Sequence, residues 1–302
     1  MKIIKSNNYK KLLIKFNYKI SKNTWFGTGG KALLFFQPKN ISELSFFLKF
    51  LPKKIKTFVI GLGSNLIIRD GGFNGVVIKL GNNFNMISLD KKNQELLVGG
   101  AVRNLDLSKF CYENSITGFE FLNGIPGSIG GSLFMNAGCF NKTISDNLIS
   151  FKLIDRVGKV YSLKKNEIKF KYRKAIIPSE SIFTEALFKT KKGDKNNIKN
   201  TILKITNLRK KNQPIANRTG GSTFENPKYK KAWKLIDEIG YRGKKIGGAM
   251  VSEKHSNFMI NIGNANSTQL ELLGEEIISE VYKKKGIKLK WEIVRLGNFV
   301  KL

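Results

Sequence analysis

The chain has 302 residues, 41% of them hydrophobic, so it is long enough for two or three domains with a substantial apolar core. Its formal net charge is +32, but the basic residues are spread along the chain and do not form an Arg-rich arm beside stacking aromatics. We therefore attribute the charge to a Lys and Asn bias rather than to a nucleic-acid surface. Two cysteines, Cys111 and Cys139, have neither metal-ligand spacing nor a disulfide framework, so no metal site is expected.

The amino-terminal segment is basic, and its longest apolar run within the first 20 residues is Leu12 to Ile14. This pattern excludes a signal peptide and a membrane span, so we expect a cytoplasmic protein with no membrane partner. Further along, strands are predicted over residues 32–37 and 55–60, with a helix between them. Asn40 at the N-cap, with Glu43 three residues later, marks the start of that helix, giving a βαβ beginning.

A glycine-rich turn, Gly61-Leu62-Gly63-Ser64-Asn65, follows the second of these strands directly. Backbone N–H groups in such a turn can face a phosphate, because no Cβ blocks its approach. Residues 66–78 then read as strand, glycine-rich turn and strand, so the usual dinucleotide fingerprint, in which the glycines open a helix, is not expected. The glycines alone would fit a plain hairpin turn equally well.

A second glycine-rich segment runs from Gly124 to Gly138 and includes Pro126. It is predicted to be a buried loop whose main chain packs against a large ligand, and two such segments suggest a long ligand. Around it, residues 82–189 are mostly strand, and a single helix near residues 104–114 is predicted to interrupt them. The clearest strand runs are 96–98, 151–157 and 182–188. Within the helix, Cys111 shares the apolar stripe of Leu107, which indicates core packing.

The carboxyl-terminal third differs in character after Gln213-Pro214. A helix with Ile198, Ile202 and Ile205 at helical spacing precedes it, and two amphipathic helices that end before Gly240 and Gly286 follow. A strand is predicted between these two helices at 258–262, and a final strand at 289–296.

These features resemble, in order, the motifs of the UDP-N-acetylenolpyruvoylglucosamine reductase family, whose FAD enzymes complete UDP-N-acetylmuramate in peptidoglycan synthesis. The resemblance covers the chain from about Trp25 to Gly297. It rests on five segments: Gly61 to Asn65, Gly124 to Gly138, Tyr172-Arg173, Gly220 to Pro227 and Ile246 to Ala249.

The resemblance implies an α+β fold, with a two-lobed FAD-binding domain of the vanillyl-alcohol-oxidase type and a carboxyl-terminal α+β substrate-binding domain. We place the first lobe at residues 1–80 with a returning strand in 289–302, the second lobe at 81–212 and the substrate-binding domain at 213–288. The cofactor is expected between the two lobes.

The resemblance also implies the catalytic residues. Reducing an enol ether beside a carboxylate needs a hydride donor, a cation to hold the carboxylate and an acid for the adjacent carbon. Arg173 matches the arginine that holds the carboxylate, and Ser222 the serine that protonates the carbon. Glu292 matches a glutamate that helps to polarise the enolpyruvyl carboxylate or relays a proton. Without the resemblance, Arg173 would be interpreted as a surface charge, Ser222 as an ordinary turn residue and Glu292 as an exposed strand residue.

The remaining site residues follow from the same motifs. FAD is expected to bind without a covalent link, because the only histidine, His255, lies outside the cofactor lobes, and NADPH is the implied hydride source. Cofactor-binding residues are Gly61, Gly63, Ser64, Asn65, Gly124, Pro126, Gly127, Ser128, Gly130, Gly131, Asn136, Ala137 and Gly138. The UDP-sugar is expected to contact Tyr172, Asn226 and His255, with Arg242 or Lys245 at its diphosphate.

The interval from Arg173 to Ser222 is short and resembles the branch of the family that lacks an inserted substrate-closing loop. Lys174-Ala175 departs from the serine that many relatives carry at the second of these positions. We expect a monomer or weak homodimer that binds small molecules and no nucleic acid. One alternative is another FAD oxidoreductase of the same cofactor fold that acts on an alcohol or aldehyde, and a second is a basic nucleic-acid-binding protein.

Overall fold

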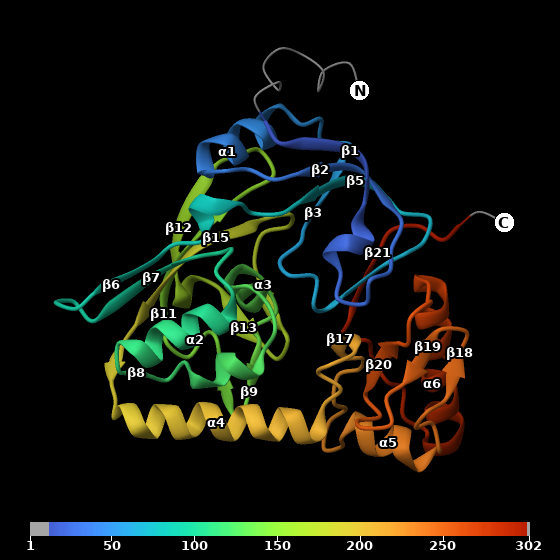
Figure 1. Cartoon of the computed structure of the whole chain (residues 1–302). Coiled ribbons are helices and arrows are strands. Elements are labelled where there is room, and N and C mark those ends of the chain that lie inside the picture. The colour runs from blue at the N-terminus through green and yellow to red at the C-terminus, as the bar shows by residue number, and fades with distance from the viewer. Residues whose placement is uncertain (1–11, 301–302) are drawn as a thin grey trace. The chain divides into compact units, whose positions relative to one another are not determined.

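The computed structural model describes residues 12–300 and divides into two compact units (Figure 1). Among these residues, the first unit comprises 12–16, 34–62 and 75–206, and the second comprises 17–33, 63–74 and 207–300. The basic residues 1–11 lie outside the described part of the chain. The division into two cofactor lobes and a substrate domain stays a prediction.

A four-stranded sheet contains the predicted βαβ beginning, and its strands β3 (Lys56–Val59) and β5 (Phe73–Ile78) run parallel. Helix α1 (Ile41–Phe50) follows β2 (Lys31–Phe36), and the Asn40 side chain accepts a hydrogen bond of 2.9 Å from the Glu43 N–H, which confirms the predicted cap. The strand after the first glycine turn, β4 (Leu66–Ile68), and its successor β5 confirm the strand–turn–strand pattern. Across the sheet the order is β1 (Ile14–Lys19), β2 (Lys31–Phe36), β5 (Phe73–Ile78) and β3 (Lys56–Val59).

The first unit is built on a five-stranded antiparallel sheet. In order its strands are β12 (Val160–Lys164), β11 (Leu148–Ile154), β15 (Ile182–Lys189), β7 (Glu95–Gly99) and β6 (Ile87–Asp90). The strand predicted over 151–157 ends earlier, because Asp155 closes a turn by accepting hydrogen bonds from the N–H groups of Val157 and Lys159. Helix α2 (Asn104–Glu113) confirms the predicted helix, and Cys111 is buried in the core beside Leu107.

The second glycine segment contains a helix and is not a continuous loop. Residues 82–189 therefore hold two α-helices, and the expectation of a single one is wrong. Helix α3 (Ile129–Phe134) forms inside it, with the Ser128 hydroxyl accepting a 3.4 Å hydrogen bond from the Gly131 N–H at the N-cap. Ile129 and Leu133 are fully buried and contact the core of the first unit. Burial of these two side chains stabilises a helix that two glycines would otherwise disfavour.

Short strands complete the first unit. They form three two-stranded pairs: β9 (Gly138–Cys139) with β10 (Lys142–Thr143), β13 (Lys169–Lys171) with β14 (Lys174–Ile176), and β8 (Ile116–Thr117) with β16 (Lys191–Lys192). Helix α4 (Lys195–Asn212) confirms the helix predicted from Ile198 and Ile205, whose side chains are buried. It contains the boundary between the two units, after residue 206.

The second unit has a four-stranded sheet in the order β17 (Arg218–Ser222), β20 (Phe258–Asn261), β19 (Ala249–Val251) and β18 (Lys245–Ile246). The sequence predicts only one strand, over 258–262, between the two amphipathic helices; β18 and β19 are additional. Those helices are α5 (Ala232–Glu238) and α6 (Ser267–Lys285), which contact each other, and α6 also contacts β18 and β19. Gly286 ends α6 with φ of 67°, as its sequence position predicts.

The final strand, β21 (Val294–Leu296), pairs in parallel with β4, opposite Leu66 to Ile68. The chain therefore returns to a strand within residues 1–80, the range to which we assign the returning strand, while the assignment of that range as a lobe stays a prediction. The strand is shorter than the expected 289–296, because Trp291 makes only an isolated bridge, to Phe224, before β21 begins.

Candidate functional site

The two glycine-rich segments meet in the first unit. A Cβ at Gly61 would lie 2.5 Å from the Ser128 hydroxyl oxygen, so a side chain at position 61 would displace that hydroxyl. Ser128 is also the N-cap of α3. Within the second unit the same turn continues through Gly63, which packs against the main chain of Asn23 and accepts a 3.0 Å hydrogen bond from the Trp25 N–H.

Two buried asparagine oxygens beside these segments have no hydrogen-bond partner among residues 12–300. They are Oδ1 of Asn136, in the second glycine segment, and Oδ1 of Asn23, which borders Gly63. Asn136 is only 7% exposed and holds a positive φ of 40°, while its Nδ2 donates to the Lys171 carbonyl at 3.1 Å. Buried acceptors are nearly always satisfied, so each oxygen, within its own unit, is a candidate acceptor for an N–H or O–H group of a ligand.

Arg173 lies in the tight turn between β13 and β14, with φ of 57°, an uncommon conformation for a residue other than glycine. Its Nη1 donates a 3.2 Å hydrogen bond to the Gly138 carbonyl, and its guanidinium lies 4.9 Å from the centroid of the Tyr172 ring. The Asn136–Lys171 hydrogen bond provides a second attachment. The turn is thus tied at two points to the second glycine segment, so the first unit brings the predicted Tyr172-Arg173 pair to the predicted cofactor residues.

Ser222 ends β17 at a bulge in the second unit. Strand β17 pairs with β20 through Thr219 and again through Ser222, and the register shifts between these two positions. Gly220 packs against the Phe26 ring, which leaves no room for a Cβ, and Gly221 has φ of 80°. Glycines are therefore required at both positions before the serine.

Glu292 lies on the segment next to Ser222. Its N–H donates a 2.9 Å hydrogen bond to the carbonyl of Thr223, the residue after the serine. The carbonyl of Glu292 accepts a 3.1 Å hydrogen bond from Asn65 Nδ2, in the first glycine turn. The second unit therefore joins the main chain of Glu292 to that of Thr223, next to Ser222, and to the side chain of Asn65. Arg173 belongs to the first unit, so its convergence with the other two catalytic candidates stays a prediction.

The predicted substrate residues mostly have protein partners. Asn226 Oδ1 accepts a 3.1 Å hydrogen bond from the N–H of Ala232, at the start of α5. Arg242 forms a 2.7 Å ion pair with Asp237 and donates to the Glu253 carbonyl at 2.6 Å, so it would have to exchange these partners to meet a diphosphate. Lys245, at the start of β18, is exposed.

His255 is half-buried between the rings of Trp233 and Phe258. Burial lowers the pKa of its imidazole, and the nearby positive charge of Arg242 lowers it further. Its Nδ1 accepts a 3.2 Å hydrogen bond from the Asn257 N–H, which places the proton of the neutral ring on Nε2.

The buried side chain of Asn257, which the sequence did not reveal, fixes the serine segment, residues 222–224. Asn257 Oδ1 accepts from the Phe224 N–H at 3.0 Å, and its Nδ2 donates to the Phe224 carbonyl at 2.9 Å. Its own carbonyl accepts a 2.7 Å hydrogen bond from the Thr223 N–H. The only sequence signal is a polar residue directly before an apolar strand, which is too common to identify the role.

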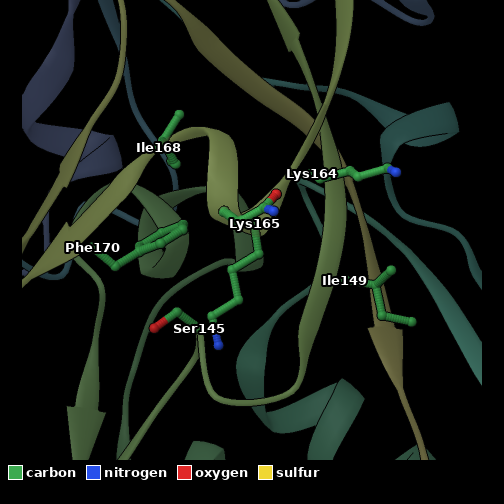
Figure 2. A pocket seen from close by; sticks show the side chains of 7 residues that line it. Ser145, Ile149, Lys164, Lys165, Ile168 and Phe170 are labelled. Atoms are coloured by element: carbon green, nitrogen blue, oxygen red, sulfur yellow. The ribbon is translucent and has the colours of Figure 1, made fainter.

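A separate cavity of about 480 Å³ lies in the first unit, beside β12 (Figure 2). Lys165 reaches across it and donates to the Asp146 carbonyl at 3.4 Å. None of the predicted site residues lines this cavity, which is bordered by Ser145, Ile149, Lys164, Lys165, Asn166, Ile168 and Phe170.

Within residues 12–300, no three or more His, Cys, Asp and Glu side chains are grouped so as to hold a metal ion. No helix in this range has the length and apolar character needed to cross a membrane. Cys139 directly follows the second glycine segment, and its Sγ donates to the Phe121 carbonyl. Both cysteines are free thiols, and burial raises the pKa of Cys111 well above its usual range.

Comparison with known proteins gives matches to both parts of the chain. A family model described as an FAD binding domain matches residues 32–164, and one described as UDP-N-acetylenolpyruvoylglucosamine reductase, C-terminal domain, matches 213–296. The UDP-N-acetylenolpyruvoylglucosamine reductases of Rickettsia prowazekii and Rickettsia felis are each 46% identical over 95% of this chain and 96% of their own length. The crystal structure of the enzyme of that name from Thermus caldophilus aligns with a TM-score of 0.82 at 28% identity, over 95% of this chain and 99% of that one. The expected fold class is confirmed by these matches.

Proposed function

The chain belongs to the UDP-N-acetylenolpyruvoylglucosamine reductase family, and we propose on that basis that it reduces UDP-N-acetylglucosamine enolpyruvate to UDP-N-acetylmuramate for peptidoglycan synthesis. It is an FAD-dependent oxidoreductase. The observation that carries the catalytic part of the proposal is the hydrogen bond from the Glu292 N–H to Thr223, which joins the segments of two catalytic candidates, Ser222 and Glu292.

The residues around the glycine segments fit FAD. Gly61 and the Ser128 side chain are in close contact, which brings the two glycine-rich segments together in the first unit. The unpartnered oxygens of Asn23 and Asn136 are suitable acceptors for the N–H and O–H groups that a flavin nucleotide carries. We propose that the segments from Gly61 to Asn65 and from Gly124 to Gly138 hold it. FAD held there would supply the hydride-transfer chemistry, with NADPH as the hydride source.

Each catalytic candidate has a distinct task. Arg173 is always charged and holds the enolpyruvyl carboxylate, on which negative charge builds as the hydride arrives. Ser222 gives its hydroxyl proton to the adjacent carbon, which completes the reduction of the double bond. A serine hydroxyl is a weak acid, so this step depends on close placement. Glu292 polarises the same carboxylate from the segment beside Thr223.

Replacement of Ser222 by alanine tests this assignment. NADPH should bleach the visible flavin absorption of Ser222→Ala at the wild-type rate, because that step needs no proton from Ser222. Reoxidation by the enolpyruvyl nucleotide should slow about 10²- to 10⁴-fold, the usual contribution of a positioned acid. Ser279→Ala, an exposed serine on α6, is the control and should leave both steps unchanged.

Equal loss of both half-reactions in Ser222→Ala would contradict the assignment. If the enolpyruvyl nucleotide failed to reoxidise the reduced wild-type flavin, and an aldehyde did reoxidise it, the protein would be an FAD oxidoreductase of different specificity. The proposal also includes a cytoplasmic monomer or weak homodimer with small-molecule partners. Steeply salt-dependent binding to DNA or RNA would contradict that part.

A further inference from the structure

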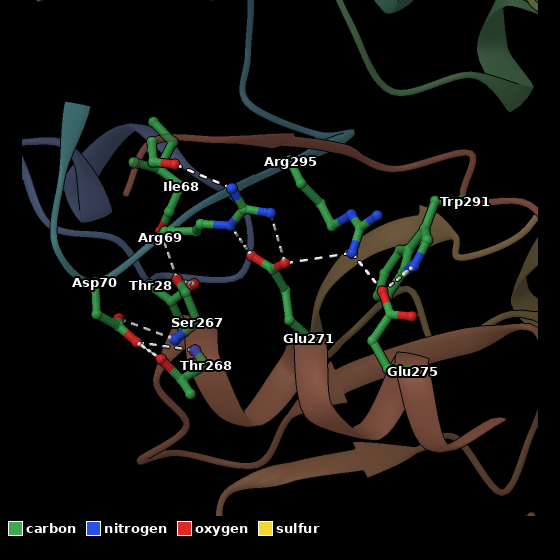
Figure 3. Close-up of polar contacts among 11 residues, drawn as sticks. Thr28, Ile68, Arg69, Asp70, Ser267, Thr268, Glu271, Glu275, Trp291 and Arg295 are labelled. Carbon is green, nitrogen blue, oxygen red and sulfur yellow. Dashed lines mark hydrogen bonds and ion pairs between the residues drawn. The ribbon is translucent and has the colours of Figure 1, made fainter. Parts of the chain in front are cut away.

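A charged network joins α6 to the strand pair β4 and β21 in the second unit (Figure 3). Its centre is Glu271, whose side chain is 4% exposed. Arg69, just after β4, contacts both Glu271 oxygens, at 2.9 and 3.1 Å, and Arg295, on β21, contacts Oε2 at 3.3 Å. Arg295 also pairs with Glu275, one helical turn further along α6, at 2.5 Å. The network therefore fixes Arg295 against the helix surface.

Trp291 lies at the end of this network. Its Nε1–H donates a 2.9 Å hydrogen bond to the same Glu275 oxygen that pairs with Arg295, and the Arg295 guanidinium lies 4.4 Å from the indole centroid (Figure 3). On α6, Gly274 makes room for the ring, since a Cβ there would overlap the indole carbons. The Phe224 ring packs against it at 5.2 Å between centroids. Trp291 thus has contacts to the helix, the guanidinium and the serine segment.

The position of this indole matters because Trp291 directly precedes Glu292. The backbone bridge between Phe224 and Trp291 and the hydrogen bond from Glu292 to Thr223 are consecutive contacts between the same two segments. One of these segments carries Ser222 and the other Glu292. A displaced ring would shift both, and misplacement of a catalytic group by about 1 Å costs about a hundredfold in rate.

We propose that Trp291 is a positioning residue, held by Gly274, Glu275 and Arg295, which sets the spacing between Glu292 and Ser222. This inference rests on the proposed function. Trp291 touches neither the substrate nor the cofactor in this scheme, so its effect is on the geometry of the two catalytic groups. Gly274 has a specific part: a methyl group there would displace the indole while every side chain of the network is retained.

The test uses the FAD-loaded enzyme and three variants. Gly274→Ala displaces the ring, Trp291→Ala removes it, and Trp291→Phe keeps an aromatic ring but loses the hydrogen bond to Glu275. Leu272→Ala, exposed on the same helix, is the control. Flavin bleaching by NADPH and flavin recovery on adding the enolpyruvyl nucleotide are measured separately at saturating reagent, together with the concentration of nucleotide that gives half the maximal recovery rate and the thermal unfolding midpoint.

Gly274→Ala and Trp291→Ala should slow recovery at saturating nucleotide about ten- to a hundredfold, with bleaching within about twofold of wild type. Trp291→Phe should restore most of the rate, and the half-saturating concentration should change less than about threefold. A purely structural role would instead lower flavin content and both rates together in proportion to lost stability, and that outcome overturns the inference. A rate of flavin recovery within about twofold of wild type in both Gly274→Ala and Trp291→Ala would also overturn the inference. If the wild-type enzyme itself failed to recover with the nucleotide, the proposed function would fall first and the inference with it, a result visible before any variant is made.

Discussion

Glu271→Gln tests how much the buried charged network contributes to stability. The substitution keeps the shape of the side chain but removes its charge, and its amide NH2 would face a guanidinium donor. Breaking a buried ion pair by removing one partner usually costs about 3–5 kcal/mol. Arg69 keeps the Gly297 carbonyl as acceptor, Arg295 keeps Glu275, and their side chains are 25% and 27% exposed. We therefore expect the lower end of that range, a loss of about 3 kcal/mol in the free energy of unfolding.

The assay is urea unfolding followed by tryptophan fluorescence, at one fixed FAD concentration. The fluorescence reports on the second unit, which contains the Glu271 network, because all three tryptophans, Trp25, Trp233 and Trp291, lie in that unit. Glu280→Gln is the matched control: the same change on the same helix, at a half-buried carboxylate 3.9 Å from the exposed Lys284. Such a pair contributes at most about 0.5 kcal/mol. If Glu271→Gln were no more destabilising than this control, the conclusion that the network holds β21 to α6 would be wrong.

Two further predictions use the same fluorescence assay. Asn257→Ala should lose about 2–4 kcal/mol, because the buried N–H and carbonyl of Phe224 lose both their partners; a loss below about 0.5 kcal/mol would mean that water replaces the amide. Because the pKa of His255 is lowered from 6.5 in the folded state, the unfolded state binds more protons, so the stability contributed by the neutral ring is complete above pH 6.5 and decreases as pH falls below it. Wild type should therefore lose more stability between pH 7.5 and 5 than His255→Asn, which keeps an acceptor for the Asn257 N–H but does not titrate, and equal losses would contradict the account.

Local signals in the sequence determined much of the fold. Asn40 and Glu43 mark the start of α1, and Gly286 marks the end of α6, because a capping side chain or a left-handed glycine acts within one helical turn. The strand–turn–strand pattern after Gly61 was readable because branched apolar residues and glycines alternate there over a short distance. The ordered motifs also sufficed to identify the family.

Tertiary structure decided the features in which residues far apart depend on one another. Helix α3 contains Gly130 and Gly131, so its propensity is poor, and it forms because its apolar side chains are buried in the core of the first unit. The contact between Arg69 and Glu271 joins residues 202 positions apart, and no periodicity in a single sequence encodes such a pair. The packing of the Trp291 ring against Gly274 likewise depends on two segments far apart in the sequence approaching each other. Propensities and caps act over a few residues, whereas these contacts exist only after the chain has closed long loops, and for this reason the folded structure was needed to find them.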